Sequence, residues 1–164
     1  MQFAVSEIPG QPAVQNTNSP KDNRFLFVAI AILAVAGIAV SGVSLQRHYA
    51  KSASQFCDFG ERFNCDIVNR SEYSTIMGIP VAGIGMVGYG VLLALATAYR
   101  SRRETPLRLL GAAGAGLVFA LYLTYIEEHV LETWCILCLI SLGVIAGITV
   151  LAGVVKWRAG NLRG

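Results

Sequence analysis

The sequence predicts an all-α integral membrane protein: a bundle of four transmembrane helices with a long extracytoplasmic loop between its first two helices. Composition is the first observation behind this prediction, because 54% of the 164 residues are hydrophobic and only 14% are charged, whereas a soluble domain is nearer about 25% charged. The second is a set of four apolar stretches, each close to the roughly 17–25 residues that cross a hydrocarbon core of ~30 Å as a helix. None of them alternates with a period of two, so strands are not expected there.

The elements follow in order along the chain. Residues 1–23 are polar and rich in Pro, Gln, Asn and Ser, which predicts a disordered cytoplasmic tail. The four predicted spans are about Phe25–Leu45, Ile79–Tyr99, Leu109–Ile126 and Cys135–Val155. The membrane domain is therefore expected at residues 24–158, with a second cytoplasmic tail at 159–164. The first span is longer than the ~7–15 apolar residues of a signal peptide and no clear cleavage site follows it, so it is expected to stay as an anchor.

The distribution of lysine and arginine predicts the orientation. If the N-terminus is inside, the outer loops hold four of these residues and the inner segments hold the other nine, namely Lys21, Arg24, Arg100, Arg102, Arg103, Arg108, Lys156, Arg158 and Arg163. Positive charge favours the cytoplasmic side. We therefore expect a multi-pass protein of the cell inner membrane with both termini in the cytoplasm. The net charge of +3 is small and no basic run carries interleaved aromatic residues, so nucleic-acid binding is not expected.

With that orientation all four cysteines lie outside the cytoplasm, where glutathione does not hold thiols reduced. Cys57 and Cys65 fall in the loop of about residues 46–78, and Cys135 and Cys138 form a C-x-x-C at the outer end of the last helix. Residues three apart share a helix face. Cys135 is expected in the first turn, where the helix dipole favours a thiolate, and Cys138 roughly 4.5 Å deeper. The spacing predicts a path for electrons from water-borne thiols to a lipid-borne acceptor.

The two cysteine pairs also admit other interpretations. Cys57 and Cys65 enclose seven residues, so a disulfide between them would be short, exposed and exchangeable. Both pairs could instead be structural disulfides that brace the loops of a non-enzymatic tetraspan protein. A zinc site of four cysteines is not expected, because the pairs sit across a loop and a lipid boundary and neither histidine has ligand spacing.

Several aromatic residues and histidines near the outer helix ends are secondary candidates. Tyr122 and Tyr125 are placed to reach a lipid-borne acceptor, although an interfacial aromatic belt also explains them. His129 is a candidate for exchanging protons with that acceptor, and His48 is expected to be a polar surface group. Tyr89 is expected near the middle of the membrane, in a packing role.

Together these residues resemble the vitamin K epoxide reductase family. The resemblance covers most of the chain after the tail, and its motifs are Cys57-Asp58, Cys65, Ser71, Tyr73-Ser74, Gly78-Ile79-Pro80, Gly85, Gly88-Tyr89 and Cys135-Ile136-Leu137-Cys138. The resemblance implies that Cys57 exchanges with a partner protein, that Cys65 attacks Cys135, and that Cys138 reacts with a quinone of the ubiquinone, menaquinone or vitamin K type. It also implies that Ser71 binds the quinone ring or orders the loop, although a solvated loop residue or a helix cap would explain Ser71 equally well.

The resemblance further implies an enzyme, a membrane oxidoreductase that acts on thiols and disulfides with a quinone as acceptor. A bacterial-type homologue without a fused thioredoxin-like domain is expected, so its partner would be a separate, DsbA-like protein and its role disulfide-bond formation. Leu142 stands where vertebrate members carry a tyrosine that helps to hold vitamin K. Plain quinone reduction is therefore expected rather than the epoxide reduction of a vitamin K epoxide reductase proper. A DsbB-type oxidase would carry its two cysteine pairs in the reverse order.

Overall fold

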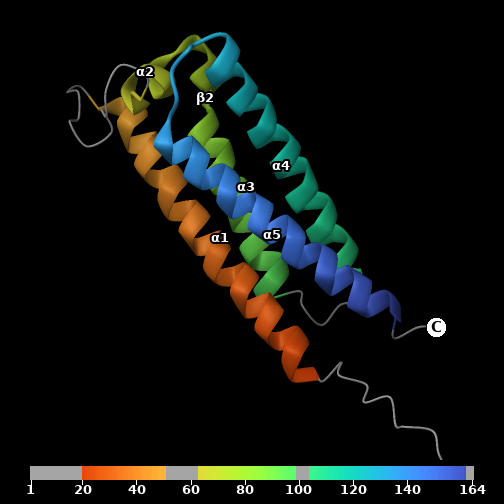
Figure 1. Ribbon diagram of the computed structural model, residues 1–164. Helices are drawn as coiled ribbons and strands as arrows, with labels where there is room; N and C mark the ends of the chain where they lie inside the picture. Colours follow the sequence, from red (N-terminus) through yellow and green to blue (C-terminus); the bar gives the residue numbers. More distant parts are fainter. Residues whose placement is uncertain (1–19, 51–62, 99–103, 162–164) are drawn as a thin grey trace, which may run out of the picture.

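The computed structural model describes residues 20–50, 63–98 and 104–161, with side chains from residue 24 onward. Four long helices lie alongside one another and form one bundle (Figure 1), which confirms the predicted all-α membrane architecture. Their bounds are α1 Pro20–Tyr49, α3 Val81–Thr97, α4 Thr105–His129 and α5 Ile136–Asn161. The first and the last two are long and apolar enough to cross a membrane, and α3 is a shorter apolar helix of 17 residues.

The helices differ from the predicted spans at their ends. Helices α1, α4 and α5 each run beyond the apolar stretch, because main-chain hydrogen bonding continues into polar residues where hydropathy falls. Cys135 was expected in the first turn of the last helix, but α5 begins one residue later, at Ile136. The Cys135 carbonyl still accepts a hydrogen bond from the Leu139 N–H at 3.0 Å, so Cys135 is the residue that caps this helix.

The packed core lies between the helices. Helix α1 packs against α3 and α5, and α4 packs mainly against α5. The fully buried apolar side chains come from α1, α4 and α5, namely Ile30, Ala34, Leu109, Ala113, Ile148 and Ala152. Helices α1 and α3 come close at Gly37, where a Cβ atom would lie 2.5 Å from the ring of Tyr89. This position therefore requires the absence of a side chain.

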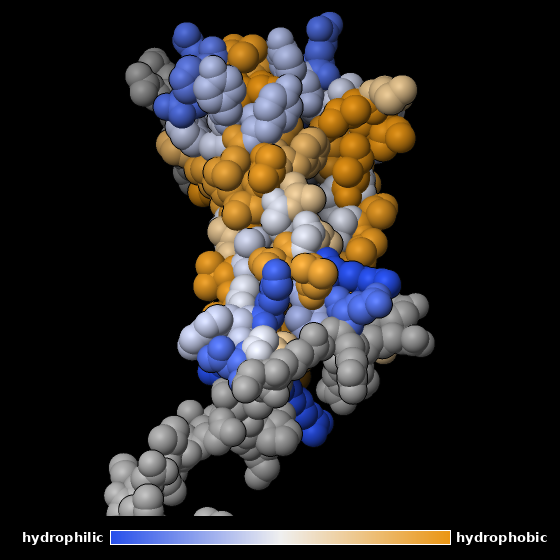
Figure 2. All heavy atoms as spheres, turned by 90° about the vertical axis from the view of Figure 1, so that its right-hand side faces the viewer, coloured by the Kyte–Doolittle hydropathy of each residue, from blue (hydrophilic) through white to orange (hydrophobic). Residues whose placement is uncertain are grey.

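The outward surface of the bundle is apolar. Large hydrophobic side chains on it are more than half exposed, among them Phe25 (73%), Val118 (69%) and Val150 (66%). Figure 2 shows hydrophobic side chains gathered between two more hydrophilic ends of the molecule. Such exposure would be costly in water, and it is what a helix bundle presents to lipid.

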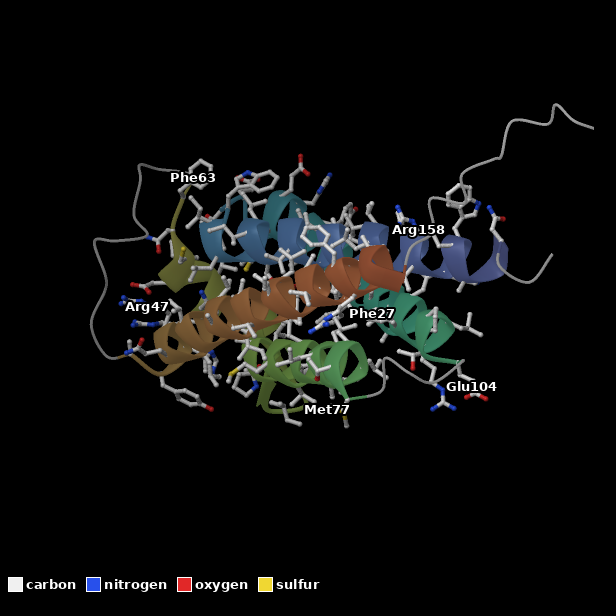
Figure 3. All side chains as sticks on the ribbon, turned by 90° about the horizontal axis from the view of Figure 1, so that it is seen from below. Phe27, Arg47, Phe63, Met77, Glu104 and Arg158 are labelled. Carbon is white, nitrogen blue, oxygen red and sulfur yellow. The ribbon has the colours of Figure 1, made fainter. Side chains whose placement is uncertain are left out.

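The two ends of the bundle are different. Arg47 and Phe63 lie near one end and Glu104 and Arg158 near the other (Figure 3). We refer to the end that holds α2, the hairpin described below and Cys135 as the cysteine end, and to the end where α1 begins and α5 finishes as the termini end. The predicted tail of residues 1–23 is described only from Pro20, where α1 already begins, and residues 162–164 also lie outside the described residues.

Part of the predicted loop of residues 46–78 is folded at the cysteine end. The short helix α2 (Cys65–Arg70) begins behind Asn64, whose side chain accepts hydrogen bonds from the N–H groups of Asp66 and Ile67 at 3.1 Å each, the usual helix cap. A single turn, η2 (Glu72–Ser74), leads into a hairpin of β1 (Thr75–Ile76) and β2 (Ile79–Pro80). Met77 and Gly78 both have positive φ angles, 52° and 81°, as a tight two-residue hairpin turn requires.

Candidate active site

Three of the four predicted cysteines come together at the cysteine end. Cys65 (1% exposed) and Cys135 (0%) belong to one buried cluster with Val68, and Cys138 packs against it. Cys65 is disulfide-bonded, whereas Cys135 and Cys138 are free thiols. Cys57 lies outside the described residues. The structure therefore brings one loop cysteine next to the C-x-x-C pair, although 70 residues separate Cys65 from Cys135 along the chain.

Main-chain contacts fix Cys65 and Cys135 relative to each other. The N–H of Asn64, directly before Cys65, donates to the carbonyl of Trp134, directly before Cys135, at 3.2 Å. Phe63 and Trp134 form a parallel bridge at the same place. The start of α2 and the start of α5 are thus joined side by side, and each presents its cysteine to the buried cluster.

Asn69 links the two cysteine pairs, and no motif in the sequence indicates it. Its side-chain nitrogen donates to the Cys65 carbonyl at 2.8 Å and lies 3.9 Å from the Cys135 sulfur. His48 was expected on the surface, but its Nδ1 donates to the Asn69 carbonyl at 2.5 Å. Through this main-chain contact, His48 on α1 helps to position Asn69, whose side-chain amide lies between Cys65 and Cys135.

The C-x-x-C pair has unequal sulfurs. A hydrogen bond from the Cys138 thiol lowers the pKa of the Cys135 thiol, and burial and the nearby Glu127 charge oppose this shift without reversing it. Cys135 is therefore the sulfur of the pair whose thiolate is favoured. The thiolate is the reactive form in disulfide exchange.

Glu127, near the end of α4, is the second residue that sequence reasoning missed. Its side chain is only 2% exposed and accepts a hydrogen bond from the Cys135 N–H at 3.0 Å. Its carboxyl group also lies next to the Cys138 thiol. The sequence shows three acids at residues 127–132, but nothing in it indicates which of them turns inward.

A cavity of about 360 Å³ opens beside the Cys138 side chain. Aliphatic side chains of all four long helices form most of its wall. A smaller group of polar residues also lines it, namely Ser41, Ser44, His48, Asn69, Ser71, Tyr73, Ser74, Tyr89, Glu127 and Ser141. Its lining residues on α5 run from Leu137 to Ile145, about 12 Å along the helix at 1.5 Å per residue.

Two cavity residues have clear structural roles. The Ser71 hydroxyl donates to the Val68 carbonyl at 2.8 Å and so closes the end of α2. Tyr89 was expected to pack near the middle of the membrane. It is indeed 5% exposed, and its hydroxyl also donates to the Ser141 carbonyl at 2.9 Å and lies 2.9 Å from the Ser141 hydroxyl. Leu142, one residue further on, is not part of the cavity lining.

The structure does not bring the other predicted candidates to this cavity. Tyr122 and Tyr125 are each 58% exposed and do not line it. His129 is exposed and stacks on Tyr125, with ring centroids 4.3 Å apart. These three residues form part of the outward surface of α4.

A comparison with known families agrees with the cysteine arrangement. The model of the vitamin K epoxide reductase family matches residues 28–153, which include all four cysteines and most of the cavity. The chain belongs to the vitamin K epoxide reductase family. Members of this family are multi-pass membrane proteins that couple thiols to quinones.

The cavity of this vitamin K epoxide reductase family member suits a quinone. A quinone ring is a flat apolar disc with two carbonyl oxygens, and ligand sites of this kind combine an apolar wall with a few placed polar groups. Here the hydroxyls of Ser41, Ser44 and Ser141 and the groups around Cys138 supply that polarity within an apolar wall.

Proposed function

We propose that this protein is a bacterial-type, quinone-linked thiol:disulfide oxidoreductase that supports disulfide-bond formation. It would reoxidise a separate thioredoxin-like protein and reduce a membrane quinone through its two cysteine pairs. The observation that carries the proposal is the cluster of Cys65, Cys135 and Cys138 beside an apolar cavity. Two structural disulfides would need no cavity at the sulfur and no free C-x-x-C pair.

The first half-reaction moves a disulfide outward. The reduced partner attacks the loop pair at Cys57, and the partner leaves with a new disulfide while the loop pair gains two thiols. Cys65 then attacks Cys135 and releases Cys138, and Cys57 resolves the mixed disulfide. Two electrons and two protons have passed from the partner to the C-x-x-C pair, and one disulfide has passed the other way. The burial of Cys65 with Cys135 and the Asn69 bridge between them support this step.

The second half-reaction reduces the quinone. The Cys135–Cys138 dithiol forms one disulfide bond and gives up two electrons and two protons, which convert the quinone to a quinol. Cys138 is the member of the pair that lines the cavity, so we assign it the contact with the quinone. Ser71 holds the end of α2 at the cavity wall, and Tyr89 with Ser141 lies deeper beside the same wall.

We further propose that residues 24–158 form the catalytic membrane domain and that both chain ends face the cytoplasm. The nine-to-four distribution of lysine and arginine supports this orientation. Labelling of the cysteines with a membrane-impermeant thiol reagent after mild reduction tests it. Reaction at Cys57 is expected from the extracytoplasmic side, and reaction only from the cytoplasm would reject the orientation.

The function itself is tested by an assay of quinone reduction with a reduced thioredoxin-like protein as the donor. We expect wild-type protein to form quinol and partner disulfide in equal amounts, and Cys138→Ser to form neither on repeated turnover. Cys138→Ser that retains near-normal quinol production would remove Cys138 from the active site. Wild-type protein without any quinol production would favour a tetraspan protein with structural disulfides.

A further inference from the structure

Glu127 is a buried acidic residue at the junction of α4 and α5. Its side chain is 2% exposed, while the neighbouring Glu128 and Glu132 are exposed. It lies in the last turn of α4, the end of a helix that disfavours negative charge. Within the described residues it makes no ion pair. A buried carboxyl group without a cation costs folding free energy, and in a membrane protein such groups are usually functional.

The side chain of Glu127 faces the redox pair. Its carboxyl group accepts a hydrogen bond from the Cys135 N–H at 3.0 Å and lies next to the Cys138 thiol. Its own carbonyl accepts the Thr133 N–H at 3.2 Å. The connection between α4 and α5 therefore folds back onto the end of α4 and holds the carboxyl group against both cysteines.

Glu127 also lines the cavity that Cys138 lines. Its carboxyl group therefore lies beside the thiol that must lose a proton and at the wall of the space in which an oxygen must gain one. Other ionisable groups of this wall are His48 on α1, Tyr73 after α2 and Tyr89 on α3. Of these, His48 is engaged by Asn69 and Tyr89 by Ser141. Glu127 is the one whose side chain contacts the redox pair, because it accepts the Cys135 N–H and lies next to the Cys138 thiol.

We propose that Glu127 is a catalytic proton carrier, which takes the proton of the Cys138 thiol and delivers it to a quinone oxygen in the cavity. The inference rests on the proposed function. The two sulfurs form one disulfide bond and supply two electrons, and their two protons end on the quinol. Glu127 relays the Cys138 proton and returns to its starting state in every cycle. A carboxyl group that relays a proton at the reacting atoms typically contributes about 10²–10⁴-fold to a rate.

The test is a single turnover of pre-reduced protein with a short-chain quinone, followed across a range of pH. Glu127→Gln keeps an oxygen that accepts the Cys135 N–H but carries no exchangeable acid proton. We expect it to slow quinol formation at least about 100-fold and to remove one inflection from the pH profile. Exchange between Cys65 and Cys135 should not slow, because loss of the Glu127 charge favours the Cys135 thiolate. Glu128→Gln is the matched control, because Glu128 is exposed on the next position of α4, and it should stay within about twofold.

A second variant, Glu127→Asp, tests the same proposal. Glu127→Asp retains the acid, so it should recover part of the rate and restore the inflection, and it replaces Glu127→Gln if that variant fails to fold in detergent. The proposal is overturned if Glu127→Gln reduces quinone at the wild-type rate, or if it slows thiol exchange as much as quinol formation. A wild-type protein that exchanges thiols but never reduces quinone would reject the proposed function instead.

Discussion

The two ends of the bundle are built on different principles. Towards the termini end the helices pack through aliphatic and small residues such as Ile30, Leu109 and Ala152, which are fully buried. Among the described residues, six polar side chains are buried, and five of them belong to the cysteine end, namely Ser41, Ser44, Asn69, Glu127 and Thr133, with Thr105 as the exception. In a membrane, buried polar groups are kept for function more than for stability. The proposed chemistry therefore falls in the polar half of the bundle, and the apolar half supports it.

The difference between the two ends is tested most severely by interrupting the exchange between the two cysteine pairs. Because Cys65 and Cys135 share one buried cluster, removal of the leaving sulfur should arrest the exchange between them. In Cys138→Ala we expect a Cys65–Cys135 bridge to accumulate, visible by mass spectrometry of a non-reduced digest. Cys65→Ala should lose all partner-driven turnover but still accept electrons from a small dithiol that reaches Cys135.

Two outcomes of the Cys138→Ala experiment would contradict the roles assigned to the cysteines. A bridge from Cys57 to Cys135 would reverse the roles of the loop cysteines. Finding Cys135 as a free thiol under all redox conditions would show that the pairs do not exchange, and the cysteine end would then be a structural region like the rest.

A second prediction concerns the unequal sulfurs of the C-x-x-C pair. The hydrogen bond from Cys138 lowers the pKa of Cys135. The Cys135 thiolate should therefore form at a lower pH than that of an ordinary cysteine, whose pKa is about 8.5. Cys138→Ala removes that hydrogen bond, and its Cys135 pKa should rise. The ultraviolet absorbance of the thiolate, followed against pH in proteins that lack Cys57 and Cys65, measures both values. An unchanged Cys135 titration in Cys138→Ala would mean that the hydrogen bond has no influence.

A third prediction tests the packing of α1 against α3 beside the cavity. A methyl group on Gly37 would lie 2.5 Å from the Tyr89 ring, whereas one on Gly42, in the same helix, would meet nothing within 4 Å. Gly37→Ala should therefore displace Tyr89 and destabilise the bundle by about 1–3 kcal/mol, the usual cost of overpacking. Gly42→Ala should be neutral or slightly stabilising, because alanine is the better helix former. Thermal unfolding in detergent compares the two, and equal midpoints would contradict the close approach of α1 and α3.

The two ends also differ in how far the sequence predicts them. Hydropathy alone identified four helices, because the part of each helix that lies in lipid must be apolar. Cysteine spacing indicated Cys135 and Cys138 as candidate site residues. Asn69 and Glu127 could not be found like this, since their roles depend on contacts with residues far along the chain. The partial burial of His48 was equally hard to predict, because a hydrogen bond to the distant Asn69 carbonyl holds this side chain at the cavity wall.

The smallest expected effect belongs to the tyrosines. Tyr122 is 58% exposed on the outward face of α4, whereas Tyr89 is 5% exposed and hydrogen-bonded to Ser141. Loss of the Tyr89–Ser141 hydrogen bond costs about 1 kcal/mol of folding free energy and leaves the Ser141 hydroxyl of the cavity wall no longer fixed. We therefore expect Tyr89→Phe to raise the KM for quinone by up to roughly fivefold. Tyr122→Phe should change neither kcat nor KM for quinone by more than about twofold, because the hydroxyl does not reach the cavity and an interfacial ring tolerates its loss. Steady-state kinetics with a series of quinone concentrations separates the two variants. A larger effect for Tyr122→Phe than for Tyr89→Phe would place a quinone contact on the outer face of α4, and the division between an inert surface and a reactive interior would have to be redrawn.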